Sequence, residues 1–118
     1  MPLSRFAFTW VPVAAWAGLI FALSSIPDLG TGLGGWDLML RKAAHLAEYA
    51  VFGALLGRAL HTTVASWTWI AWAAGAAYAA SDELHQHFVP GRQASPLDFV
   101  IDALGVAVGL LAVRVATQ

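Results

Sequence analysis

The segment at residues 79–105, AASDELHQHFVPGRQASPLDFVIDALG, concentrates acids, histidines, a glutamine and an arginine in a chain that is otherwise apolar. Only 11% of the residues are charged, and the mean hydropathy is +0.69. A charged side chain in apolar surroundings costs free energy unless it is paired or hydrogen-bonded. Charge gathered in this way indicates a site built inside the protein, whereas evenly spread charge would indicate a solvated surface.

Polar side chains recur at spacings of three and four residues in three parts of the chain, so most members of each set share one helix face. The sets are Arg41, Lys42, His45, Glu48 and Tyr49; Tyr78, Asp82, His85 and Gln86; and Asp98 and Asp102, which Gly105 and Gly109 continue. We expect the three faces to converge in one polar pocket near one side of a membrane. Ionisable groups are costly inside a membrane, so a cluster of this size predicts a functional site.

Proton transfer suits these residue types, because histidine and carboxylates in a partly dry pocket are tuned for it. Lys42 and Arg92 could clamp a phosphate or carboxylate group. A divalent metal stays open as a cofactor: the histidines and carboxylates could supply N and O ligands, but no HExxH or comparable motif is present. The absence of cysteine excludes thiolate chemistry and Cys-ligated metals.

Some charged residues have simpler explanations. Asp98 follows Ser95 by three residues, as in a helix-capping box. Arg5, Arg58 and Arg114 are typical of side chains that extend to lipid headgroups. The formal net charge of −1 argues against nucleic acid as a partner, because there is no bulk positive charge to attract it.

Four stretches approach the length of about 20 residues that a helix needs to cross a membrane. They run from Phe6 to about Ser24, from about Leu38 to Leu60, from about Val64 to Ser81 with an extension toward His87, and from about Pro96 to Val113. The sequence thus predicts an all-α, membrane-embedded four-helix bundle, a single domain over residues 1–118. A cleaved secretory signal is the rival interpretation of the first stretch, but that run is long and contains Trp10, Pro12 and Trp16.

The connections contain helix-breaking and capping residues. SSIPDLGTGLGGWD joins the first two helices, and we expect Asp37 to cap the second. HTTVAS forms the turn between the second and third helices, and Ser95 with Pro96 marks the start of the fourth. Both termini and the central turn then share one side of the membrane. Basic residues tie at three per side, so we favour N-in, C-in only because the second set lies among acids.

Three motifs resemble the VanZ-like family of small membrane proteins: SSIPD, RKAAHLAEYAVFG and YAASDELHQHFVPGRQASPLDFVIDALG. The resemblance covers nearly the whole chain. It implies that the family's characteristic polar positions correspond to Ser25, Lys42, His45, Glu48, Tyr49, Asp82, Glu83, Gln86, Arg92, Asp98 and Asp102. The family's namesake is associated with lowered susceptibility to the glycopeptide antibiotic teicoplanin, so an effect on that susceptibility is an expectation from the resemblance alone.

Three functions remain open. The first is a cell-membrane enzyme that modifies an anionic envelope lipid or lipid-linked glycan. In that enzyme the catalytic residues would be His45, Glu48, Asp82, Glu83, His85 and Asp102, and the substrate-binding residues Ser25, Lys42, Tyr49, Gln86, Arg92 and Asp98. The second is a non-catalytic protein that binds such a lipid or an antibiotic's lipid tail, or that conducts ions or protons. The third is a scaffold of an envelope complex, whose polar cluster joins its helices.

Overall fold

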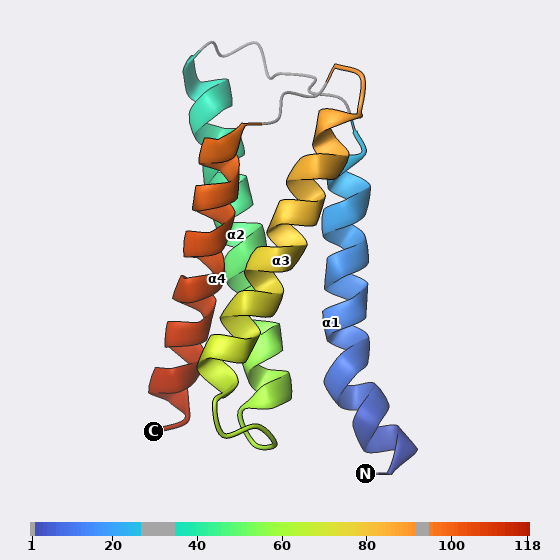
Figure 1. Cartoon of the computed structure of the whole chain (residues 1–118), viewed down its shortest axis with the longest axis vertical. Coiled ribbons are helices and arrows are strands. Elements are labelled where there is room, and N and C mark those ends of the chain that lie inside the picture. The colour runs from blue at the N-terminus through green and yellow to red at the C-terminus, as the bar shows by residue number, and fades with distance from the viewer. Residues whose placement is uncertain (1, 27–34, 92–94) are drawn as a thin grey trace.

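Four α-helices make up the computed structural model, which describes residues 2–26, 35–91 and 95–118 (Figure 1). They are α1 (Leu3–Ser24), α2 (Gly35–Leu60), α3 (Trp67–His87) and α4 (Pro96–Ala116). No strand occurs among the described residues. The prediction of an all-α, four-helix fold is therefore confirmed.

The two ends of the bundle hold different charged residues. Both termini and the turn between α2 and α3 lie at one end (Figure 1). We call it the basic end, because the helix turns nearest to it carry Arg5, Arg58 and Arg114. At the opposite end, which we call the polar end, α1 and α3 finish and α2 and α4 begin. Its ionisable side chains include Lys42, His45, Asp82, Asp98 and Asp102.

Three helices begin elsewhere than the sequence predicts. α1 begins at Leu3, before Phe6, α2 begins at Gly35, before Leu38, and α3 begins at Trp67, after Val64. α3 also continues to His87, as its predicted extension requires. Residues 61–66 form the predicted turn between α2 and α3.

The predicted cap of α4 is confirmed, whereas that of α2 is wrong. The Asp98 amide donates to Ser95 Oγ at 3.3 Å, and Pro96 occupies the first turn, where a missing N–H costs nothing. Asp37 is already inside the first turn of α2. Its carboxylate there still interacts favourably with the positive end of the helix dipole.

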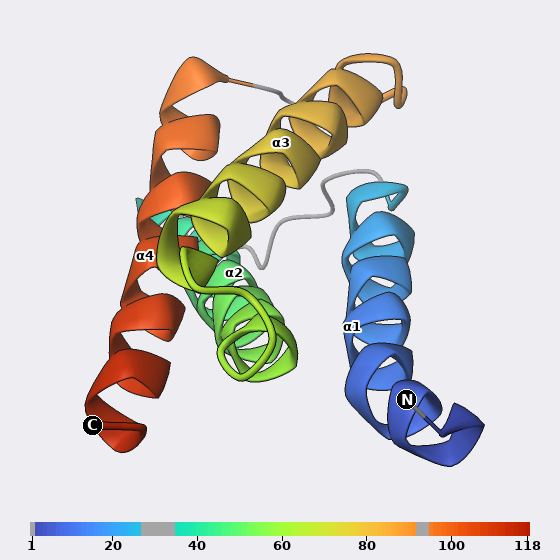
Figure 2. The same ribbon diagram turned by 60° about the horizontal axis from the view of Figure 1, so that its bottom comes forward.

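α2 and α4 run in the same direction and lie side by side in both views (Figure 1, Figure 2). Glycines permit their close approach, since a Cβ at Gly109 would overlap the carbonyl oxygen of Ala50. A Cβ at Gly105 would lie 2.7 Å from the carbonyl oxygen of Leu46. Small residues at this spacing are typical of helices that pack closely in membranes. α1 packs on α2 and α3 and, within the described ranges, makes no contact with α4.

A proline in α1 explains how α1 is attached to α2 at the basic end. Pro12 has no N–H to donate to the carbonyl of Phe8, one turn earlier. Arg58 of α2 satisfies this carbonyl instead: Nη2 donates to it at 3.1 Å, and the guanidinium lies 4.4 Å from the centroid of the Phe8 ring. Lipid could not supply such a donor. Arg58 is thus engaged by the protein, and the prediction that it simply extends to lipid headgroups is incomplete.

The apolar core is small. It contains Ile20, Tyr49, Phe52, Leu56, Val106 and Leu110. Many large apolar side chains are instead exposed on the outer faces of the helices, including Phe8, Leu111 and Val115. α1 and α4 are long and apolar enough to cross a membrane. These features support association with a membrane, and the passage of all four helices through it stays a prediction.

Candidate functional site

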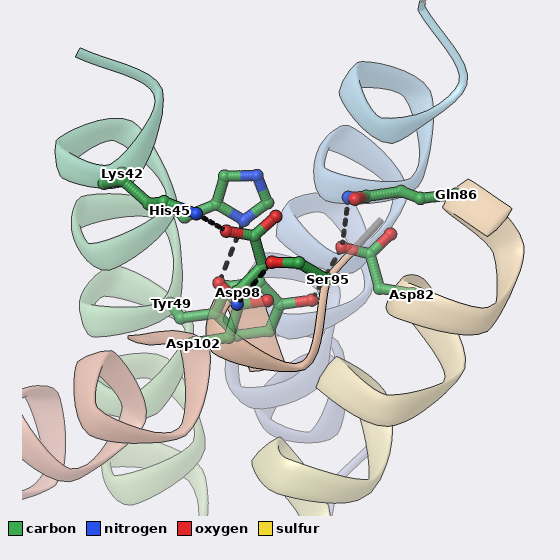
Figure 3. A network of polar contacts seen from close by, with 8 residues as sticks. All are labelled: Lys42, His45, Tyr49, Asp82, Gln86, Ser95, Asp98 and Asp102. Carbon is green, nitrogen blue, oxygen red and sulfur yellow. Dashed lines mark hydrogen bonds and ion pairs between the residues drawn. The ribbon is translucent and has the colours of Figure 1, made fainter. Parts of the chain in front are cut away.

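Two successive polar contacts join α2 to α4 at the polar end (Figure 3). Lys42 Nζ forms an ion pair with Asp98 Oδ1. One turn further along both helices, His45 Nδ1 lies 2.9 Å from Asp102 Oδ1. Because the two helices run in the same direction, residues three apart on α2 meet residues four apart on α4. The Asp102 side chain is fully buried, and that of Lys42 is the most accessible of the four.

A third contact joins the same face of α2 to α3. Tyr49 OH donates to Asp82 Oδ2 at 2.9 Å, and Gln86 Nε2 donates to the same oxygen at 3.4 Å. All three side chains are buried. Tyr49 lies one turn after His45, so the polar faces of α3 and α4 both meet that of α2, as the spacings predict.

Several buried oxygens of this cluster have no donor among the described residues. They are Asp82 Oδ1, Gln86 Oε1 and Asp102 Oδ2. Gln86 is 1% exposed and Asp102 0% exposed, so bulk water does not reach them freely. An unpaired buried polar atom costs about 1–3 kcal/mol, and it is usually completed by a proton, a water or a ligand. These oxygens of the polar end can therefore each accept a further hydrogen bond.

Ser25 and His85, both predicted site residues, contact each other instead of the buried His45–Asp102 pair. His85 Nε2 lies 2.9 Å from Ser25 Oγ, and its ring stacks on Phe21 with centroids 4.4 Å apart. The Ser25 hydroxyl also donates a hydrogen bond to the Phe21 carbonyl oxygen at 2.8 Å. His85 then donates to Ser25. This arrangement holds α1 on α3 and does not activate the hydroxyl as a nucleophile.

Glu48 and Glu83 flank the cluster. Glu48 lies on α2 one turn after His45 and is partly buried. Glu83 is also partly buried and follows Asp82 on α3. Both add negative charge close to the His45–Asp102 pair.

Lys42 and Arg92 are the residues predicted to bind an anion. The charge of Lys42 is compensated by Asp98 within the protein. Arg92 lies outside the described residues. In the described part of the polar end, carboxylates outnumber cations. This balance favours a ligand that donates hydrogen bonds over a ligand that brings only negative charge.

Comparison with known families agrees with this picture. The family model described as VanZ/LLP1 matches residues 2–117, which is almost the entire chain. The chain belongs to the VanZ/LLP1 family. The resemblance carried by the sequence motifs is thereby confirmed. No curated protein and no solved structure matches the chain significantly.

The described part of this VanZ/LLP1 protein contains no group of side chains that could bind a metal ion. Over residues 2–26, 35–91 and 95–118, no three His, Asp or Glu side chains are grouped so that they could hold a metal ion. His45 and Asp102 bond to each other, and Asp82 accepts from Tyr49 and Gln86. The described donors and acceptors fit proton transfer and hydrogen bonding better than metal coordination.

Trp16 is a neighbour of the site that motif analysis missed in this VanZ/LLP1 chain. Its indole Nε1 donates to the backbone carbonyl of Glu48 at 2.8 Å, which fixes α1 against the polar face of α2. A usable signal is present in the sequence, because a tryptophan in an apolar helix needs an acceptor for its N–H. Only the fold could identify that acceptor.

Proposed function

We propose that this protein is a membrane enzyme that modifies the polar headgroup of an envelope lipid or a lipid-linked glycan, with His45 as general base and acid. The observation that carries the proposal is the buried contact of 2.9 Å between His45 Nδ1 and Asp102 Oδ1. A carboxylate on Nδ1 fixes the orientation and tautomer of an imidazole and leaves Nε2 to exchange a proton with a substrate.

The unsatisfied acceptors support a substrate headgroup that carries hydroxyl or amino groups. Asp82 Oδ1, Gln86 Oε1 and Asp102 Oδ2 are buried and lack donors among the described residues. Sugar, glycerol and amine headgroups supply such donors. The phosphate of the same lipid would contact Arg92 or compete with Asp98 for Lys42.

Membrane orientation and antibiotic susceptibility belong to the same proposal. With the N- and C-termini in the cytoplasm, the polar end faces the extracytoplasmic side, where headgroups of envelope precursors are present. An effect on teicoplanin susceptibility would follow if the modified molecule is a precursor of the cell wall.

A scaffold role is the alternative that a specific observation also favours. Lys42–Asp98 and Tyr49–Asp82 join α2 to α4 and α3, as interhelical polar contacts do in structural bundles. A purely structural cluster should, however, satisfy its own buried groups, and this one leaves acceptors without donors in the described residues.

Lipid mass spectrometry tests the proposed enzyme. The purified protein is incubated in nanodiscs made from a total lipid extract of its source organism, and the lipids are compared before and after. We expect a lipid product whose rate of formation falls by about 100-fold or more in His45→Asn, because general acid–base catalysis contributes about 10²–10⁴-fold. Asparagine retains a donor toward Asp102, so the fold should persist.

The matched control is His61→Asn. His61 lies at the basic end, where its Nδ1 contacts the carbonyl oxygens of Gly57 and Arg58, so the product should form at the wild-type rate. Equal product formation by the wild type and His45→Asn would reject His45 as the acid–base residue. No change in any lipid with the wild type would shift support to the scaffold.

A further inference from the structure

A groove between α3 and α4 lies at the basic end, away from the polar cluster. Its cavity of about 420 Å³ is within the size range of ligand sites. The walls are almost wholly apolar and include Trp69, Trp72, Leu110 and Leu111. Ala107 forms part of the wall and leaves space that a larger side chain would fill.

Trp72, in the α3 wall of the groove, is hydrogen-bonded to α4. Trp72 Nε1 donates to the Ala103 carbonyl oxygen of α4 at 3.2 Å, so the indole bridges the two helices. Trp69 is 76% exposed and extends outward from α3. Tryptophans near helix ends are typical of the interface between hydrocarbon and headgroups.

The groove continues into a second, more polar cavity of about 510 Å³ at the helix ends. Ser66 and Thr68 of the α3 start line it, together with Arg114 from the last turn of α4. Arg114 Nη1 donates to Thr68 Oγ1 at 2.9 Å, which orients the guanidinium toward this cavity's wall. Among the residues that the structure describes, no acidic side chain lines either cavity.

We propose that this groove binds one anionic phospholipid, with an acyl chain along the Trp69–Trp72 wall and the phosphate at Arg114. α4 is apolar enough to span a membrane, so its last turn reaches the depth of lipid phosphates. No acidic side chain among the described lining residues offsets the positive charge of Arg114, which selects an anionic headgroup, and the adjoining apolar groove selects a chain in preference to a free phosphate. This site does not depend on the enzyme activity proposed for the polar end.

Native mass spectrometry of the full chain, purified from an equimolar mixture of phosphatidylglycerol and phosphatidylcholine in detergent, tests the proposal. We expect the wild type to retain phosphatidylglycerol over phosphatidylcholine by about tenfold, since charge-assisted hydrogen bonds are the strong ones. Arg114→Gln should bring that ratio to about one. Ala107→Phe should lower the retention of both lipids, because it fills the groove.

The control is Arg5→Gln, which removes an equal charge from the basic end outside the groove. Its retention ratio should equal that of the wild type. Equal retention of the two lipids by the wild type would overturn the proposal, and so would an equal loss in Arg5→Gln and Arg114→Gln. Glycerol phosphate that displaces the bound lipid completely would show that the apolar groove contributes nothing. A dimer without lipid would identify a second copy as the occupant.

Discussion

The polar end and the basic end of the bundle hold charge in opposite ways. At the polar end, His45, Asp82 and Asp102 are buried and bonded between helices. At the basic end, Arg58 donates to the Phe8 carbonyl oxygen and is partly buried, and Arg114 donates to Thr68 Oγ1 and is exposed. Buried charge depends on accurate helix packing, whereas an accessible arginine does not.

In the functions proposed above, this difference assigns chemistry to the polar end and lipid attachment to the basic end. The buried acceptors lack donors among the described residues, so a proton, a water or a ligand that enters between the helices would satisfy them. The exposed Arg114 can reach lipid phosphates without any rearrangement of the fold. Substitutions that disturb helix packing should therefore damage the polar end most, and loss of the exposed Arg114 charge should leave the fold intact.

Gly109→Ala should lower the stability of the bundle more than Tyr49→Phe does. Its methyl group would overlap the Ala50 carbonyl oxygen and lie 2.6 Å from Ala54 N, so α2 and α4 must separate. We expect the free energy of unfolding to fall by about 3 kcal/mol, at the upper end of overpacking effects. Thermal unfolding in detergent measures this.

The same substitution at Gly18 is the matched control. A Cβ there has no neighbour within 4 Å, so Gly18→Ala should stabilise α1 by up to about 1 kcal/mol through helix propensity. A melting temperature of Gly109→Ala equal to that of the wild type would contradict the close α2–α4 contact.

Tyr49→Phe should have a smaller effect, because it removes one hydroxyl group and leaves the packing unchanged. Asp82 Oδ2 would keep only the long hydrogen bond from Gln86, and we expect a loss of about 1–3 kcal/mol. Arg114→Gln at the basic end should change stability by less than about 0.5 kcal/mol. Equal melting temperatures for the two variants would remove the energetic difference between the ends.

Much of the fold could be predicted from the sequence. The apolar runs and the Ser95–Pro96 start signal place the helices within a few residues. The order of packing could not be predicted, because hydropathy does not say which apolar faces meet. The direct α2–α4 contact depends on Gly105 and Gly109, and in a chain rich in glycine and alanine that spacing is a weak signal.

The site could be predicted as a set of residues but not as a set of partners. Helical spacing put His45 and Tyr49 on one face, and the structure gives them different acceptors, Asp102 and Asp82. Spacing also grouped His85 with Asp82, although His85 turns toward α1. Side-chain direction across helices depends on their relative rotation, which a single sequence does not encode locally.

We propose that the His45–Asp102 pair is present for function and not for stability. The measurement is the melting temperature of His45→Leu/Asp102→Ala, a double variant that removes both polar groups at nearly the same total side-chain volume. His45→Leu alone should lose about 3–5 kcal/mol, because it leaves the fully buried Asp102 carboxylate without its partner.

The double variant should regain that loss and melt at or above the wild-type temperature, while the lipid product disappears. Replacing a buried pair with apolar groups is often neutral or stabilising, and functional sites are commonly less stable than they could be. A double variant as unstable as His45→Leu alone would show that the pair holds the helices together, and would contradict the claim.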